Sequence, residues 1–383
     1  MAIILYPKEI QIFFDEVTAR IQKVLNPELI LVAGSFGKGS WLFCDKKLIS
    51  DFEFAFVSKS WSPKKKKQLL KSLNLEYDYD IHLKGFLLSK VEKKIIFNYS
   101  FKKSNYISLD FFDTFYQPKV LYSKNSEPLN LVLTANEIPI WEAWRLYVNR
   151  MGDILSLPKP KKKPQYTNNY YWLKIFESTA DIYLIINKKY IPNIDERIKS
   201  FEEVTDKNDE NLDQICTKSI PLIKDALKAR KEHNLEIFNI SSLTNNEKCM
   251  IVNAWMNYIQ EKLVLEEKLD LNKNFYLSYT NNKNLQKKYL GIQSKNSILI
   301  SNLIKLVLNP KLINKTFKFY NFNLSWRHLI LLTISSIFLE SNSNSNFVES
   351  RIIASKIFHL NEIKNHDSNS LIKLVSNYWK ILR

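Results

Sequence analysis

Residues 33–54, AGSFGKGSWLFCDKKLISDFEF, hold the features that decide how this chain folds. The chain has 6 glycines in 383 residues, where an average composition would give about 27, and Gly34, Gly37 and Gly39 all fall in this segment. Glycine is favoured where the backbone adopts positive φ or approaches another group closely. A β-rich run at residues 28–33 precedes the glycines, and an alternating run at residues 51–57 follows them. The segment is therefore predicted to form a strand, a tight turn and a second strand.

Two carboxylates stand two positions apart in the second predicted strand. Residues i and i+2 of a strand point to the same face, so we expect Asp51 and Glu53 to converge on one side of the sheet. Carboxylates at this spacing can hold one or two divalent cations for a phosphoryl displacement. A third carboxylate is needed to complete such a cage. Asp110 is the best candidate, in the predicted strand YISLDFF of residues 106–112, and Asp113 is the fallback.

The glycine turn is expected to bind phosphate groups. Gly34 and Ser35 offer main-chain N–H groups and a hydroxyl to a triphosphate, because backbone amides that no side chain obstructs can form an anion nest. The order GSFGKGS lacks the GxxxxGK[ST] spacing of a P-loop ATPase, so that class of enzyme is not supported.

Three motifs in order carry a resemblance to a known family. They are GS at residues 34–35, DFE at residues 51–53 and LDF at residues 109–111. Together they resemble the DNA polymerase β-like nucleotidyltransferase superfamily over about residues 25–115. The resemblance implies an α+β fold and the metal-dependent transfer of a nucleoside monophosphate from an NTP, with release of pyrophosphate.

The resemblance also implies roles for individual residues. Asp51, Glu53 and Asp110 would be the catalytic metal ligands for Mg²⁺, with Mn²⁺ as an alternative, and Asp110 would also act as a base toward the acceptor. The nucleotide would be bound by Gly34, Ser35, Lys38 and, from the helical half of the chain, Lys174. Fifteen residues separate the GS and DFE motifs, slightly more than is usual for the family, so we expect the loop of residues 38–49 to bulge.

Apolar periodicity divides the chain into two predicted domains. Residues 1–130 form the nucleotidyltransferase domain, with a helix at 5–25 and strands at 28–33, 51–57, 78–83, 95–99 and 106–112. Residues 136–383 form an all-α domain, with helices at about 138–157, 167–188, 207–231, 244–268, 295–308, 325–341, 346–362 and 369–381. Three tryptophans near the start of the helical domain, Trp141, Trp144 and Trp172, are expected to pack the domains together.

Two polar patterns have ordinary interpretations. Glu76, Asp78, Asp80 and His82 are predicted to form the solvent side of one strand. The lysine runs at residues 64–67 and 159–163 are each predicted to be a solvated face or a linker, with a ligand-facing patch as the alternative.

The composition limits the partners only loosely. The formal net charge is +17, which favours a polyanion, but 48 of the 56 basic residues are Lys, and Arg is the preferred reader of bases and phosphates. Three widely spaced cysteines predict neither a disulfide framework nor a zinc site. We expect no signal peptide, no membrane span and a cytoplasmic location.

The acceptor of the nucleotide is not indicated by the sequence. ATP is one candidate donor, and RNA, a small molecule, a protein or a second nucleotide in a cyclic product are open as acceptors. The alternative function is that of a catalytically degenerate member of the fold, which binds nucleotide or RNA as a scaffold or sensor.

Overall fold

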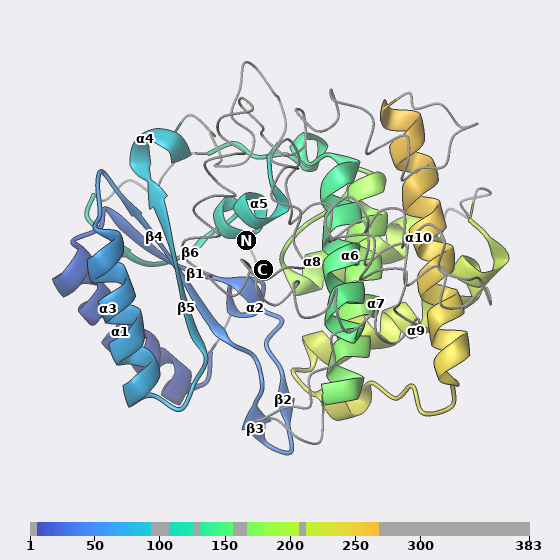
Figure 1. Ribbon diagram of the computed structural model, residues 1–383, viewed down its shortest axis with the longest axis horizontal. Coiled ribbons are helices and arrows are strands. Elements are labelled where there is room, and N and C mark those ends of the chain that lie inside the picture. The colour runs from blue at the N-terminus through green and yellow to red at the C-terminus, as the bar shows by residue number, and fades with distance from the viewer. Residues whose placement is uncertain (1–5, 93–106, 126–130, 156–166, 207–211, 268–383) are drawn as a thin grey trace, which may run out of the picture.

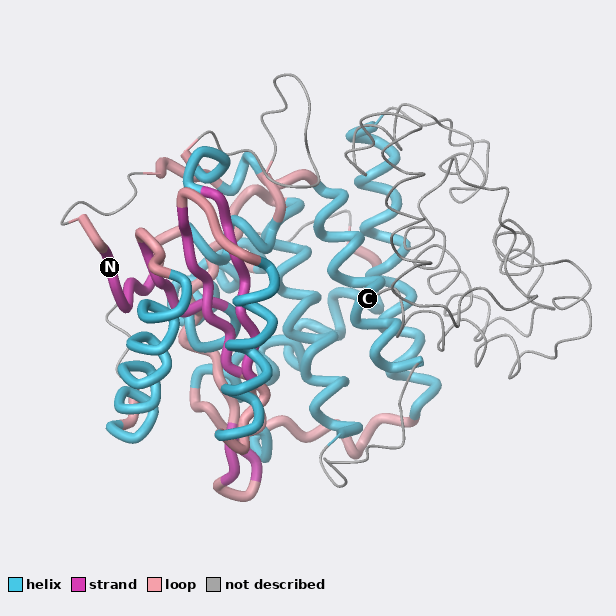
Figure 2. The backbone as a smooth tube through the Cα atoms, turned by 60° about the vertical axis from the view of Figure 1, so that its left-hand side comes forward, coloured by secondary structure: helices cyan, strands magenta, loops and turns pink. Residues whose placement is uncertain are grey.

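A four-stranded sheet lies between two layers of helices (Figure 1). The structure, a computed structural model, describes residues 6–92, 107–125, 131–155, 167–206 and 212–267. Helices α1 (Lys8–Leu25) and α3 (Pro63–Glu76) cover one face of the sheet, and α5 (Leu109–Phe115) with a larger helical layer covers the other. In the turned view of Figure 2, the strands again lie between helices on both sides. The predicted α+β class is confirmed.

The sheet is mixed, and its order brings two segments of the quoted stretch to its centre. Its strands are β1 (Leu29–Ala33), β4 (Phe52–Ser58), β5 (Ile81–Leu87) and β6 (Lys119–Ser123). The order is β5-β4-β1-β6, with β4 parallel to β5 and β1 antiparallel to both β4 and β6. The two predicted strands are therefore confirmed as β1 and β4, and the glycine segment after β1 forms a single helical turn, α2 (Gly34–Gly37).

Strand β4 separates two hydrophobic cores by simple alternation. Phe52, Phe54 and Phe56 pack into the core under α1 and α3. Ala55 and Val57 pack into the other core, which extends into the helical layer. Since successive side chains point to opposite faces, residue 53 faces the helical layer.

The remaining elements surround this frame. On the sheet side they are α2 (Gly34–Gly37), β2 (Phe43–Cys44), β3 (Lys47–Leu48) and α4 (Leu88–Val91). The helical layer comprises α6 (Ile140–Leu155), α7 (Thr167–Ile186), α8 (Ile194–Thr205), α9 (Gln214–Lys231) and α10 (Asn245–Glu267), with 3₁₀ turns η1 (Ala135–Glu137) and η2 (Leu235–Ile237).

The helical layer follows the periodicity of the sequence closely. Four predicted helices coincide with α6, α7, α9 and α10, whereas α8 was not predicted. The helices predicted after residue 268 and the strand predicted at 95–99 lie outside the described residues. Trp141, Trp144 and Trp172 are buried in the core that runs from the sheet into this layer, and the domain boundary at 130–136 stays a prediction.

The lysine run at residues 64–67 belongs to a helix that was not predicted. Ser62 accepts a hydrogen bond from the backbone N–H of Lys65, and Pro63 occupies the first turn, so the start of α3 is capped. Leu69 and Leu73 are its buried residues, and the lysines lie mainly toward solvent as expected.

The strand predicted at residues 106–112 is wrong. Ser108 accepts a hydrogen bond from the N–H of Phe111 at 3.2 Å and caps a helix, α5. The N–H of Leu109 donates to the buried carboxylate of Glu142 at 2.8 Å. These two bonds satisfy N–H groups at the start of the helix, which outweighs the β propensity of the flanking aromatics.

The strand predicted at residues 78–83 is wrong in its start. Helix α3 continues through Glu76, and β5 begins only at Ile81. The four polar side chains predicted to share one strand face therefore do not lie on one strand. Strand β6, at the other edge of the sheet, was not predicted.

The loop of residues 38–49 forms a small hairpin, β2–β3. The N–H of Phe43 donates to the carbonyl of His233 at 2.9 Å, and the imidazole Nδ1 of His233 lies 3.1 Å from the carbonyl oxygen of Trp41. The loop is thus fastened to the segment after α9.

Among the helices of the described residues, none has the length and apolar character that a membrane span requires.

A buried ionic network holds α7, α8 and α9 together. The guanidinium of Arg197, which has no exposed surface, lies 2.7 Å from Asp181 Oδ1 and 3.1 Å from Glu177 Oε1. Arg230 binds the other oxygen of Glu177 at 2.7 Å. Removing one member of such a network leaves buried charge without compensation.

We expect Arg197→Met to lower the free energy of unfolding by about 3–5 kcal/mol, because Asp181 and Glu177 would lose a buried partner. Urea denaturation followed by circular dichroism measures the change. Lys199→Met, an exposed position on the same helix, is the matched control and should change stability by no more than about 0.5 kcal/mol. Equal losses in the two variants would contradict this account of α8.

Candidate functional site

Strands β4 and β5 present polar side chains to the helical layer at one end of the sheet. Glu53 on β4 pairs in register with His82 on β5. Ile81 and Leu83 pack into the core beneath α1 and α3, so His82 and Lys84 point to the opposite face, the one that Glu53 shares. The parallel pairing of β4 with β5 therefore gathers one acidic and two basic side chains.

Gly34 allows the Glu53 carboxylate to lie against the backbone. Its φ is 61°, in the left-handed region that favours glycine. A Cβ atom at this position would lie 2.7 Å from both Cδ and Oε1 of Glu53. The residue before Gly34, Ala33, is the β1 partner of Glu53. The glycine turn and the carboxylate therefore fit together only because residue 34 lacks a side chain.

Lys84 bridges two of the predicted carboxylates. Its Nζ lies 2.5 Å from Glu53 Oε2 and 2.6 Å from Asp110 Oδ1. Burial lowers the pKa of Lys84, but the charges and hydrogen bonds of Asp110 and Glu53 outweigh it, so the pKa is raised. The same ammonium lowers the pKa of Asp110 against the effect of burial. Residues 53 and 110 thus meet through one cation.

Asp51 lies on the same side and has its own partners. Its Oδ2 is 3.3 Å from Nε2 of His82. Burial raises the pKa of Asp51, but the hydrogen bond from His82 and the charge of Lys174 outweigh it, so the pKa is lowered. The hydrogen bond to Asp51 correspondingly raises the pKa of His82. Asp51 is therefore ionised, and the charge of Lys174, on α7 in the helical layer, contributes to this.

Lys38 belongs to a second cluster, with Asp113 and Tyr190. Its Nζ lies 2.5 Å from Asp113 Oδ2 and 3.2 Å from the hydroxyl oxygen of Tyr190. The Tyr190 hydroxyl donates to Asp113 Oδ1 at 2.7 Å. Asp113, the fallback for the third carboxylate, therefore binds Lys38 and Tyr190, and Asp110 is the one linked to Glu53.

Helices α8 and α9 anchor the turn that follows Gly34 and Ser35. The N–H of Ile194 donates to the carbonyl of Lys38 at 2.9 Å, and Arg230 Nη1 donates to the carbonyl of Ser40 at 3.1 Å. Arg230 also belongs to the buried ionic network. The helical layer thus fixes the glycine turn through charged side chains and backbone hydrogen bonds.

Lys174, Ser178 and Asp181 all lie on α7, but in two different environments. Lys174 lies 4.3 Å from the centre of the Tyr170 ring and acts on Asp51. Ser178 accepts a hydrogen bond from Arg150 at 3.3 Å, and Asp181 pairs with Arg197. These last two side chains stabilise the helical layer.

The residues present fit a divalent cation. Mg²⁺ prefers oxygen ligands, which Asp51 and Glu53 supply from one face of the sheet. The Ser35 hydroxyl is buried and has no hydrogen-bond partner among the described residues, so it is able to form a hydrogen bond with a bound ligand. The ligand atoms of the three carboxylates do not all lie within 4.8 Å of one another; among the described residues, the set that does is Cys44, Asp45 and Glu236.

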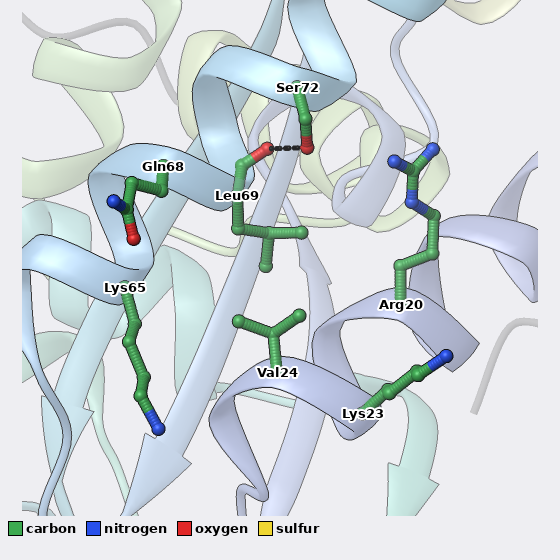
Figure 3. Close-up of a pocket in the computed structure, with 7 residues that line it drawn as sticks. All are labelled: Arg20, Lys23, Val24, Lys65, Gln68, Leu69 and Ser72. Carbon is green, nitrogen blue, oxygen red and sulfur yellow. Dashed lines mark hydrogen bonds between the residues drawn. The ribbon is translucent and has the colours of Figure 1, made fainter.

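A hollow on the far face of the sheet is separate from this group. Figure 3 shows it between α1 and α3, where Lys23 and Lys65 flank the apolar Val24 and Leu69. Arg20, at the same hollow, pairs with Glu76. It lies on the opposite side of the sheet from the carboxylates, because α1 and α3 pack on the other core.

Lys84 is a functional candidate that sequence patterns missed, and His82 was predicted to face solvent. Their position depends on the register between β4 and β5, which are separated by α3 in the chain. The alternation of Ile81 and Leu83 with polar residues was the available signal.

No known family model and no curated protein sequence matches the chain.

We expect Gly34→Ala to lower the free energy of unfolding by about 1–3 kcal/mol and to displace the Glu53 carboxylate, because the new Cβ meets that carboxylate. Gly39→Ala is the control, since Gly39 also has positive φ, at 72°. Urea denaturation should give the larger loss for Gly34→Ala. If Gly39→Ala lowers the free energy of unfolding as much as Gly34→Ala or more, backbone strain alone would explain the glycine at position 34.

Proposed function

We propose that the chain is a metal-dependent nucleotidyltransferase, which transfers a nucleoside monophosphate from an NTP to an acceptor and releases pyrophosphate. The observation that carries the proposal is that the carboxylates of Glu53 and Asp110 both bind the Lys84 ammonium beside Gly34, although 57 positions separate the two acidic residues in the chain. The mixed α+β architecture, with the glycine turn between β1 and β4, supports the nucleotidyltransferase fold in particular.

Asp51 and Glu53 are the residues that would hold Mg²⁺, or Mn²⁺ in its place. When bound, the cation neutralises phosphate charge and orients the oxygens of the transferred group. Asp51 directly precedes β4 and Glu53 is the second residue of that strand, so both carboxylates come from one short segment of the chain. The lowered pKa of Asp51 keeps its carboxylate ionised and ready to act as a ligand.

Asp110 would position the acceptor. Its Oδ1 binds Lys84, and its side chain is about half exposed, at 53%. The carboxylate can accept a hydrogen bond from the acceptor hydroxyl. The hydroxyl proton passes to solvent as its oxygen bonds to the α-phosphorus and the bond to the leaving pyrophosphate breaks. Since the pKa of Asp110 is lowered, its main contribution is orientation. Alignment and charge neutralisation then supply most of the rate enhancement.

The nucleotide phosphates would meet the glycine turn and the basic side chains around it. Gly34 and Ser35 offer backbone N–H groups and a buried hydroxyl, and Lys174 lies on the side of Asp51. Lys38 would have to exchange its contacts with Asp113 to bind phosphate. ATP is one candidate donor, and RNA, a small molecule, a protein or a second nucleotide are candidate acceptors.

One observation favours a second candidate function. Lys84 stands where a cation between Glu53 and Asp110 would bind, as expected if the fold had lost catalysis and kept nucleotide or RNA binding as a scaffold or sensor. Calorimetry distinguishes the two functions. NTP binding without any turnover supports the scaffold, whereas metal-dependent turnover supports the enzyme.

We expect Asp51→Ala and Glu53→Ala to reduce nucleotide transfer by more than about 100-fold, because even residues that only orient metal ligands contribute about 10–100-fold. The assay incubates each α-³²P-labelled NTP with Mg²⁺ and separate pools of RNA, protein and small acceptors, and resolves the labelled products. Asp45→Ala, an exposed acidic residue on the β2–β3 hairpin, should retain full activity. Undiminished transfer by the Asp51→Ala variant would contradict the proposal.

A further inference from the structure

Lys84 fills the space that a cation shared by Glu53 and Asp110 would need. Its Nζ lies 2.5 and 2.6 Å from one oxygen of each carboxylate. Those distances are close to the 2.0–2.6 Å at which Mg²⁺ and Ca²⁺ bind oxygen ligands. The ammonium and a bridging metal ion therefore cannot occupy this place together.

The sheet holds Lys84 firmly in this position. Lys84 is opposite Ala55 in the parallel pairing of β5 with β4, and its side chain is 31% exposed. Two ionised carboxylates bind its head group, one from the adjacent strand and one from α5. Both contacts are short, charge-assisted hydrogen bonds, and either carboxylate would lose its partner if the lysine turned away.

The charges around the site balance with one divalent cation. Asp51, Glu53 and Asp110 carry three negative charges, and one ammonium with one divalent ion carries three positive charges. Lys174 adds positive charge beside Asp51. A second divalent cation in the free protein would therefore meet an excess of positive charge, which disfavours its binding.

We propose that Lys84 is a resident cation that replaces one metal ion, so that the site takes a single divalent cation between Asp51 and Glu53. The inference rests on the proposed function. It also explains why the ligand atoms of Asp51, Glu53 and Asp110 do not form a compact set among the described residues. Asp110 is coupled to the site through the ammonium and does not need to touch the metal.

Mn²⁺ titration of the full chain tests the inference. The electron paramagnetic resonance signal of free Mn²⁺ gives the number of ions bound per chain, without nucleotide and without any activity. We expect the wild type to bind one ion, Asp51→Ala to lose it, and Lys84→Met to bind one ion more than the wild type. Lys64→Met, an exposed lysine on α3, is the charge-matched control and should match the wild type.

Two further variants locate the additional ion. Lys84→Arg keeps a cation and should bind the same number of ions as the wild type. Lys84→Met combined with Asp110→Asn removes a carboxylate that the additional ion needs, and should return the count to that of the wild type. If Lys84→Met does not fold, as judged by circular dichroism, Lys84→Gln takes its place because it keeps the length and polarity of the side chain.

Each outcome has a distinct meaning. An additional ion in Lys84→Met that depends on Asp110 supports the inference. Equal numbers of bound Mn²⁺ ions in the wild type and in Lys84→Met overturn the inference. Two ions dependent on Asp51 in the wild type also overturn it, but if that protein transfers nucleotide, the proposed function still holds. A wild type with no ion dependent on Asp51 and no transfer would overturn the proposed function as well.

Discussion

The contact of one lysine ammonium with two carboxylates is the interaction on which the candidate site depends. Lys84 comes from β5, Glu53 from β4 and Asp110 from the first turn of α5, so the contact joins three elements that are distant in the chain. Without the ammonium, two carboxylates directed at one place would repel each other. The same contact places Asp110 near the sheet, although its helix begins with contacts to the helical layer.

The helical layer positions the glycine turn as much as the sheet does. Arg230 joins the carbonyl of Ser40 to the buried network around Glu177, and Ile194 donates to the carbonyl of Lys38. The backbone that follows Gly34 and Ser35 is therefore held from both sides. This arrangement gives a physical reason for buried charge in α7, α8 and α9, where apolar packing alone would not bind the carbonyl groups of the turn.

Local patterns predicted the parts of the structure that depend on local forces. The strand, turn and strand of residues 28–57 followed from alternation and from glycine at position 34, and most helices of the helical layer followed from their period. The helix at Asp110 did not, because it depends on a cap at Ser108 and on Glu142, which lies 33 positions after residue 109. Lys84 could not be assigned to the site because its role depends on the register between β4 and β5 and on the start of α5. The residues next to Lys84 in the sequence indicate neither of these. Pairing of Lys38 with Asp113 and Tyr190 likewise depends on contacts across 75 or more positions.

The most direct test is the position of Mn²⁺ in crystals of the full chain, located by its anomalous scattering. The account predicts one peak at bonding distance from carboxylate oxygens of Asp51 and Glu53, with the Lys84 ammonium still between Glu53 and Asp110. A peak that replaces the ammonium between those two carboxylates, or density confined to Cys44, Asp45 and Glu236, would contradict it.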